Sequence, residues 1–145
     1  MRVPQSLRER AVFVDTSAWK ALIDTADQCH ESIKKQFEKC RSEKIVLETT
    51  DYVVSETLTL LRIRPGLGFR VAVQFGQMVH SSQVIQINVI TPDLFQKAWG
   101  IFQRYSDKDF SFVDCSSFAL MEKKGLREAL TLDIHFTQYG FEILR

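Results

Sequence analysis

Cysteine is scarce in this sequence, and long hydrophobic runs are absent. The 145 residues include three cysteines, Cys29, Cys40 and Cys115, an odd number spaced too widely for a disulfide framework or a zinc site. No apolar run approaches the roughly 20 residues that a transmembrane helix needs, and the opening MRVPQSLRER lacks the apolar core of a secretory signal. We therefore expect a cytoplasmic protein, with no membrane association and with reduced thiols.

Neither sign of charge dominates. Nineteen lysines and arginines oppose 18 aspartates and glutamates, which gives a formal net charge of +1. The strongly basic composition that usually marks a nucleic-acid-binding domain is missing. Such a partner is not excluded, because acidic side chains gathered in one metal pocket would leave the remaining surface more basic.

Proline and glycine are also sparse, with three and six residues, and no linker or low-complexity segment interrupts the chain. At 45% hydrophobic residues, the length suits one domain with a full core and is too short for two. We predict a single domain over residues 1–145, with residues 1–10 as a short N-terminal extension. The one clear break, at residues 64–68, separates two predicted helices and indicates a helical hairpin.

Predicted strands and helices alternate along the chain. Short apolar, β-branched runs predict buried strands at 11–14, 44–48, 83–89, 129–132 and 142–144. Amphipathic spacing predicts helices at 16–24, 29–43, 52–64, 69–80, 92–105 and 111–124. This alternation favours an α/β fold, a three-layer α/β/α sandwich around a mainly parallel sheet of four to five strands.

Four acidic residues fall where the alternation brings separate segments to one edge of the sheet. Asp15 and Asp133 follow strands, whereas Glu56 and Asp114 lie near the starts of helices. Ligands of open α/β sheets bind at the carboxyl ends of the strands. Four carboxylates can therefore meet at one point.

Carboxylates brought together repel each other unless a cation neutralises them. Hard oxygen ligands suit Mg²⁺ or Mn²⁺, and the natural chemistry of such a site is hydrolysis of a phosphodiester. The spacing alone leaves open the alternative that the acids serve as helix caps. In the stretch from Asp15 to Ser17, Thr16 or Ser17 is the expected N-cap of the next helix.

Four motifs, taken in order, resemble those of PIN-domain ribonucleases. They are Val14–Ala18, Thr49-Thr50 with Val54–Leu58, Tyr105–Asp114 and Ala129–Phe136. Their order and spacing are similar to those of the VapC toxins of toxin–antitoxin pairs, and the resemblance extends from about residue 11 to the end.

The resemblance implies a PIN-like fold and a metal-dependent endoribonuclease. It implies that Mg²⁺ or Mn²⁺ is bound by the catalytic acids Asp15, Glu56, Asp114 and Asp133. Thr16 and Ser111 match the polar residues that orient those acids. The implied partners are an RNA substrate, a second copy of the chain and a small VapB-like antitoxin that inserts a basic residue into the acidic cleft. A free-standing PIN nuclease in RNA processing and a non-catalytic RNA-binding module remain as alternatives.

Polar neighbours of these acids have open roles. Thr131 is placed to hydrogen-bond Asp133. Asp107 and Asp109 could extend the metal site or cap the helix that follows them.

Two histidines, His30 and His135, invite a general-base role that a metal-activated water does not require. Their functions stay unassigned. An apolar face on the predicted hairpin, at residues 69–78, favours a homodimer.

Overall fold

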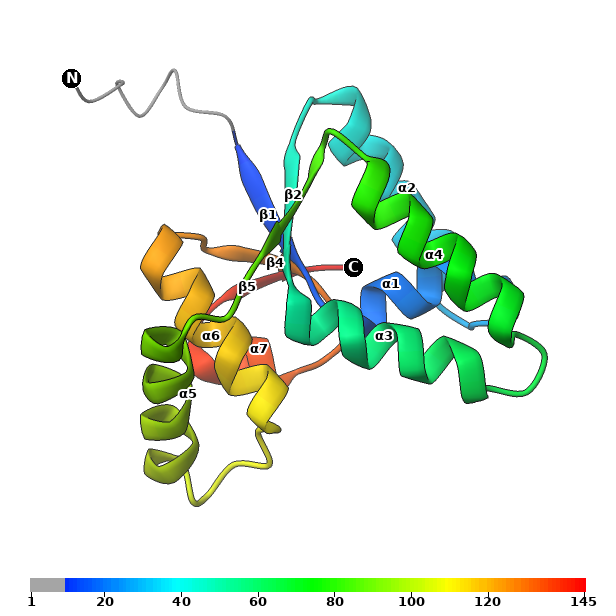
Figure 1. Ribbon diagram of the computed structural model, residues 1–145. Coiled ribbons are helices and arrows are strands. Elements are labelled where there is room, and N and C mark those ends of the chain that lie inside the picture. The colour runs from blue at the N-terminus through cyan, green and yellow to red at the C-terminus, as the bar shows by residue number, and fades with distance from the viewer. Residues whose placement is uncertain (1–9) are drawn as a thin grey trace.

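A sheet of five parallel strands forms the centre of the fold (Figure 1). The computed structural model describes residues 10–145, so nearly all of the predicted N-terminal extension lies outside the described residues. The strands are β1 (Ala11–Val14), β2 (Val46–Thr50), β3 (Ile85–Asn88), β4 (Glu128–Leu130) and β5 (Glu142–Leu144). Their order in the sheet is β3-β2-β1-β4-β5, which confirms the predicted α/β fold with a parallel sheet.

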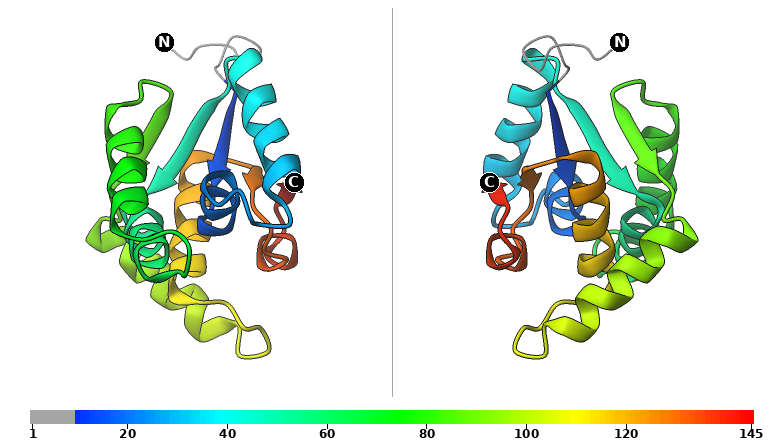
Figure 2. Two further views of the ribbon diagram at one scale, coloured as in Figure 1. Left: turned by 90° about the vertical axis from the view of Figure 1, so that its right-hand side faces the viewer. Right: turned by 90° about the vertical axis from the view of Figure 1, so that its left-hand side faces the viewer.

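Helices cover both faces of this sheet. Within residues 10–145 they are α1 (Thr16–Ile23), α2 (His30–Ser42), α3 (Asp51–Ile63), α4 (Phe69–Ser81), α5 (Pro92–Arg104), α6 (Phe112–Lys124) and α7 (His135–Tyr139). In Figure 1, α1 to α4 lie to the right of the strands and α5 and α6 to the left, and the side views in Figure 2 agree. No helix in this part of the chain combines the length and apolarity needed to cross a membrane.

Three strands differ in their bounds from the prediction, and one helix was not predicted. β3 spans 85–88 rather than 83–89, and β4 spans 128–130 rather than 129–132. β2 spans 46–50 rather than 44–48, because Lys44 adopts a positive φ of 56° and the Ile45 amide still bonds to the Cys40 carbonyl at the end of α2. Thr50 consequently ends the strand and caps α3, where its hydroxyl accepts the Val53 amide at 3.0 Å. Helix α7 was not predicted, since five residues are too few to show helical periodicity.

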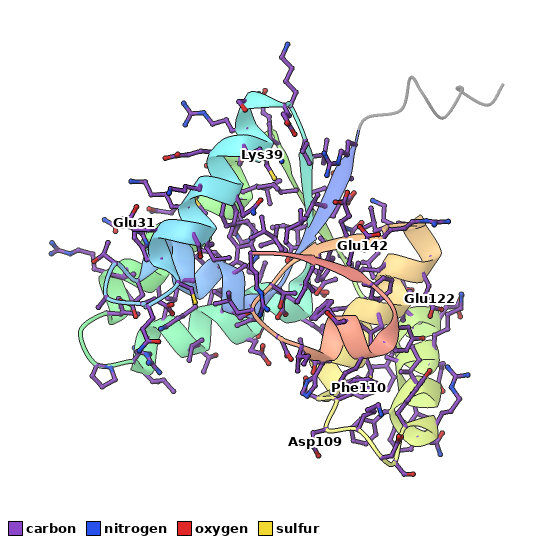
Figure 3. All side chains as sticks on the ribbon, turned by 180° about the vertical axis from the view of Figure 1, so that it is seen from behind. Glu31, Lys39, Asp109, Phe110, Glu122 and Glu142 are labelled. Carbon is purple, nitrogen blue, oxygen red and sulfur yellow. The ribbon has the colours of Figure 1, made fainter. Side chains whose placement is uncertain are left out.

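The core lies between the sheet and these helices, where side chains fill the space (Figure 3). Trp19 and Phe75 are fully buried and meet edge to face, with ring centroids 5.6 Å apart. Trp99 is 46% exposed on α5 and stacks on Phe102, with ring centroids 6.0 Å apart.

The α3–α4 hairpin is the predicted helical arm. Gly66 and Gly68 have φ of +86° and +106° in the connection, conformations that favour glycine. Ile63 and Phe69 are 72% and 63% exposed, whereas Phe75 turns into the core. Of the apolar residues expected to form a surface at 69–78, Phe69 and the 39% exposed Val73 do so, whereas Ala72 and Phe75 are buried.

An ion pair between a buried glutamate and a partly exposed lysine joins α6 to the sheet. Glu48 of β2 is 5% exposed and accepts hydrogen bonds from Lys124 Nζ at 2.7 and 2.8 Å and from Asn88 Nδ2 at 3.0 Å. Lys124 is the last residue of α6, and Asn88 is the last residue of β3. This acid is thus neutralised within the fold and ties the C-terminal end of α6 to β2 and β3.

Candidate active site

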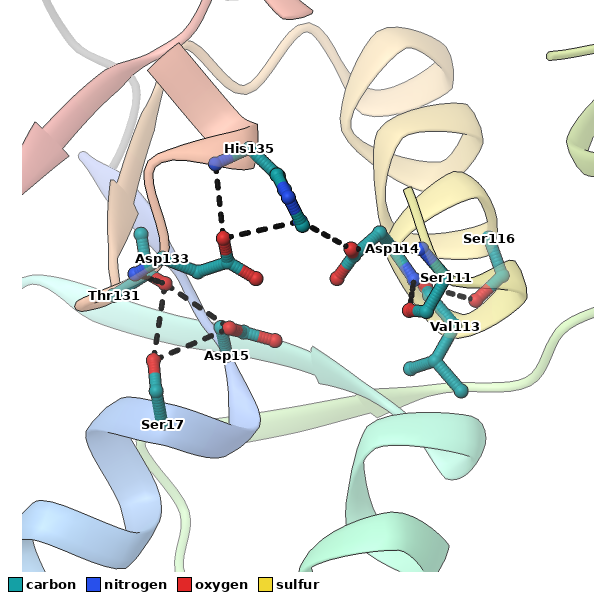
Figure 4. A network of polar contacts seen from close by, with 9 residues as sticks. All are labelled: Asp15, Ser17, Ser111, Val113, Asp114, Ser116, Thr131, Asp133 and His135. Atoms are coloured by element: carbon teal, nitrogen blue, oxygen red, sulfur yellow. Dashed lines mark hydrogen bonds and ion pairs between the residues drawn. The ribbon is translucent and has the colours of Figure 1, made fainter. Parts of the chain in front are cut away.

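Three of the four predicted acids converge at the carboxyl edge of the sheet (Figure 4). Asp15 directly follows β1, and its amide donates to the Leu130 carbonyl at the end of the adjacent β4. Asp133 lies in the turn after β4, and Asp114 lies in the first turn of α6. Parallel pairing of β1 and β4 brings the first two together, and α6 supplies the third.

Asp15 is buried and supported by hydroxyl groups. Its carboxyl oxygen Oδ2 accepts hydrogen bonds from Thr131 Oγ1 at 3.0 Å and from Ser17 Oγ at 3.3 Å. The side chain makes no hydrogen bond that caps α1, so the capping alternative does not hold at this position. Burial raises the pKa of the Asp15 carboxyl to about 7, and the nearby negative charge of Asp114 contributes to the rise.

Asp114 is fixed by the start of its own helix. The Ser111 hydroxyl accepts the Asp114 amide at 3.0 Å, and the Ser111 amide donates to Asp114 Oδ2 at 3.0 Å, which completes a capping box. Burial raises the pKa of the Asp114 carboxyl, although the Ser111 amide opposes the rise. Ser111 therefore orients this acid, as its place in the motif implied.

His135 lies between two of the acids. Its Nδ1 is 3.0 Å from Asp114 Oδ2 and 3.2 Å from Asp133 Oδ1. The His135 amide also donates to Asp133 Oδ1 at 2.9 Å. One ligand atom from each of the three residues lies within 4.8 Å of the other two, a spacing that a single metal ion can span.

Glu56 stands apart from this group. It is exposed in the second turn of α3 and lines an open groove of about 550 Å³ with Tyr52 and Val113. Val113 precedes Asp114, so the groove connects α3 to the start of α6. The structure thus places Glu56 beside the site but not among the clustered ligand atoms.

Several predicted supporting residues have different roles. α1 begins at Thr16 with Asp15 in the N-cap position, and the buried Thr16 hydroxyl has no hydrogen-bond partner within residues 10–145, so the predicted cap is wrong. Asp107 and Asp109 are exposed on the loop before α6, where Figure 3 labels Asp109, and neither joins the metal group. They do not cap α6 either, because Ser111 does.

The contacts of His30, Thr131 and Ser17 define the roles of these residues. His30 Nδ1 is 2.8 Å from the Ala21 carbonyl, which links α2 to α1 and leaves His30 in a structural role. Thr131 reaches Asp133 as predicted, but through the Asp133 amide at 3.0 Å, and it also bonds to Asp15. Ser17 was not predicted as a support for Asp15. Its spacing of two residues from Asp15, typical of local hydroxyl contacts, was the available signal.

The donor set fits a divalent cation. Asp15 and Asp114 are held close together with Asp133, and burial raises the pKa of the Asp15 and Asp114 carboxyls. Asp15, Asp114 and Asp133 could hold Mg²⁺ or Mn²⁺, which would activate water and offset negative charge on a phosphodiester undergoing cleavage.

Comparison with known proteins decides the family. A family model described as the PIN domain matches residues 12–142, nearly the whole chain. The chain belongs to the PIN-domain family. The acids at the edge of the sheet are thus the acids of a PIN domain, and the predicted resemblance is confirmed.

Similar PIN-domain proteins include VapC20 of Mycobacterium tuberculosis, named a 23S rRNA-specific endonuclease. This chain is 37% identical to it over 134 residues, which cover 92% of this chain and 98% of the relative. The crystal structure of VapC20, described as a sarcin–ricin loop cleaving toxin, matches with a TM-score of 0.82 and 38% identity over 90% of this chain and 95% of that one. The predicted resemblance to VapC toxins is therefore confirmed.

More distant structures share the fold. VapBC2 from Rickettsia felis, solved with promoter DNA, matches with a TM-score of 0.69 at 9% identity, over 92% of this chain and 96% of that one. FitAcB from Neisseria gonorrhoeae matches with a TM-score of 0.61 at 11% identity, over 92% of this chain and 96% of that one. Both structures therefore match the fold of this chain over nearly its full length.

Proposed function

We propose that this PIN domain is a Mg²⁺- or Mn²⁺-dependent endoribonuclease and the toxin of a VapBC-type pair. The observation that carries the proposal is the convergence of Asp15, Asp114 and Asp133 at one edge of the sheet, in a chain 37% identical to VapC20. A binding module without catalysis would have no need to hold buried carboxylates at such short range against their mutual repulsion.

Each acid has a proposed role. Asp15, Asp114 and Asp133 bind the metal directly, and Glu56 completes the set from α3 across the groove. Glu56 suits this role because its exposed carboxylate forms no ion pair within residues 10–145. Thr131 and Ser17 orient Asp15 through their hydroxyl groups.

The proposed substrate is a structured loop of the large ribosomal RNA. VapC20 is named for cleavage of 23S rRNA, and its likeness to this chain covers nearly the full length of both. At 37% identity, we propose the same class of RNA substrate for this chain, and we propose no cut position.

The proposed partners are a small antitoxin and a second copy of the chain. VapBC2 is a toxin–antitoxin complex of the same fold, which supports a VapB-like partner that reaches the acidic cleft. A basic side chain inserted there would form charge-assisted hydrogen bonds with the clustered carboxylates. The exposed Ile63 and Phe69 at the end of the α3–α4 arm supply apolar surface that a homodimer would cover.

The direct test is cleavage of ribosomal RNA by the purified protein. We expect discrete cuts in the large rRNA with Mg²⁺ or Mn²⁺, complete loss in EDTA, and recovery when excess metal is added back. The reason is that the clustered acids cannot stabilise an anionic transition state without a cation. Primer extension across the cut separates one endonucleolytic site from general degradation. Undiminished cleavage in EDTA would contradict the proposal.

A growth experiment tests the toxin role. Expression of the wild-type chain should arrest growth, and co-expression of the product of a neighbouring short gene with a basic amphipathic tail should relieve the arrest. Asp15→Asn should be harmless at the same protein level, measured by immunoblot. If the active nuclease is harmless when expressed alone, a free-standing processing nuclease is the better account.

A further inference from the structure

His135 is the one histidine of the described chain that contacts the acid cluster. The sequence has three histidines. His30 Nδ1 lies near the Ala21 carbonyl and His80 Nδ1 near the Gly76 carbonyl, so both serve local backbone contacts. His135 Nδ1 instead lies close to carboxylate oxygens of Asp114 and Asp133. The four-acid site proposed above leaves this nitrogen without a role.

The position of the ring is fixed by the backbone and by packing. The His135 amide is bonded to Asp133 Oδ1 at 2.9 Å, which holds the backbone at the start of α7. The buried Phe110 ring meets the imidazole edge to face, with centroids 5.5 Å apart. Figure 4 shows the ring directed into the space between Asp133 and Asp114. The nitrogen is thus aimed at the cluster by packing and by the backbone.

The distances suit metal ligation as well as hydrogen bonding. Neighbouring ligands of an octahedral ion with bonds of about 2.1 Å lie about 3.0 Å apart. His135 Nδ1 is 3.0 Å from Asp114 Oδ2 and 3.2 Å from Asp133 Oδ1. The nitrogen therefore already stands at the separation of adjacent ligands from each of the two carboxylate oxygens, so a cation could bind between them with little movement of the ring.

We propose that His135 Nδ1 is a direct nitrogen ligand of the divalent ion, beside Asp114 and Asp133, and that it makes the site favour Mn²⁺ over Mg²⁺. This inference rests on the proposed metal-dependent nuclease. On metal binding the ring keeps a single proton, on Nε2, and offers the Nδ1 lone pair to the ion. Mg²⁺ prefers oxygen ligands, whereas imidazole suits transition metals, so this one nitrogen separates the two ions.

Nitrogen ligation can be tested on the wild-type protein without any substitution. Pulsed electron paramagnetic resonance of bound Mn²⁺ detects a directly coordinated nitrogen as an echo modulation. We expect a ¹⁴N modulation in unlabelled protein and its replacement by a ¹⁵N signal in protein grown with ¹⁵N-histidine. Bound Mn²⁺ without nitrogen modulation would overturn the inference and leave the proposed function intact. Failure to bind Mn²⁺ at all would overturn both.

Substitutions assign the signal to one residue. His135→Gln should remove the modulation and lower the ratio of Mn²⁺ to Mg²⁺ affinity about ten-fold, measured by calorimetry. His80→Gln is the matched control, since His80 is exposed on α4 and should leave both quantities unchanged. A nitrogen modulation that persists in His135→Gln would overturn the inference, because another nitrogen would then be the ligand. Tighter Mn²⁺ binding by that variant would overturn it too, because the ring would then only occupy space that the ion needs.

Discussion

Replacing Asp15 with asparagine should lower the rate of rRNA cleavage by a factor of about 1,000 or more. Asp15 is buried, lies at the end of the central strand and carries part of the negative charge that would hold the metal. Asparagine keeps the shape and can still accept the Thr131 hydroxyl, so the change removes charge with little disturbance of packing. Single-turnover cleavage with saturating metal measures the effect.

Asp107→Asn is the matched control for that loss. Asp107 is exposed, pairs with its neighbour Lys108 at 3.0 Å and lies outside the metal group. The same chemical change at Asp107 should alter the cleavage rate by less than about three-fold, because an exposed ion pair contributes little to the stability of the fold and Asp107 does not contact the acids. Equal activity of the wild-type and Asp15→Asn proteins would remove Asp15 from the mechanism.

The same Asp15→Asn substitution should stabilise the metal-free protein at alkaline pH. The pKa of the Asp15 carboxyl is about 7 in the folded state against an ordinary 3.8, chiefly because of burial. The folded state therefore holds its proton more tightly than the unfolded state does. Stability from this group is fully present below about pH 4 and is lost as the pH rises through 7.

The size and sign of this effect can be measured. A rise from 3.8 to about 7 corresponds to about 4 kcal/mol at most above pH 7, a limit that structural relaxation lowers. In EDTA at pH 8, Asp15→Asn should raise the free energy of unfolding by about 1–3 kcal/mol, and at pH 4 the gain should vanish. Urea titrations at both pH values provide the measurement.

Metal should reproduce this stabilisation in the wild-type protein only. Mg²⁺ or Mn²⁺ at pH 8 should raise the midpoint of wild-type unfolding and have a much smaller effect on Asp15→Asn. If Asp15→Asn is less stable than wild type at both pH values, the prediction is wrong. The Asp15 carboxylate would then stabilise the fold as a hydrogen-bond acceptor, and its buried charge would not destabilise it.

The convergence of Asp15, Asp114 and Asp133 was predictable because it depends on the backbone. Parallel strands end at one edge, and apolar runs mark where β1 and β4 end. The capping box at Ser111 and Asp114 was similarly open to prediction, since it depends on residues three apart.

Contacts that depend on side-chain directions were beyond the sequence. The place of His135 between two acids follows from α7, which is too short for a periodic signal, and from the packing of Phe110. Thr16 was expected as a cap because hydroxyl residues favour that position, yet Asp15 already holds it. Loop acids such as Asp107 and Asp109 offered no pattern that could separate a ligand from a solvated charge.

The Lys124–Glu48 ion pair gives α6 a second attachment, far from the acids at its other end. Residues 114–121 of α6 are buried without interruption, so this stretch of the helix is enclosed by the elements packed around it. A helix enclosed in this way and anchored at its last turn has no route to partial opening, and its amides should exchange with solvent only when the whole domain unfolds. We therefore expect Asp114 to stand on one of the slowest-exchanging parts of the protein, whereas Glu56 lies on the exposed side of another helix.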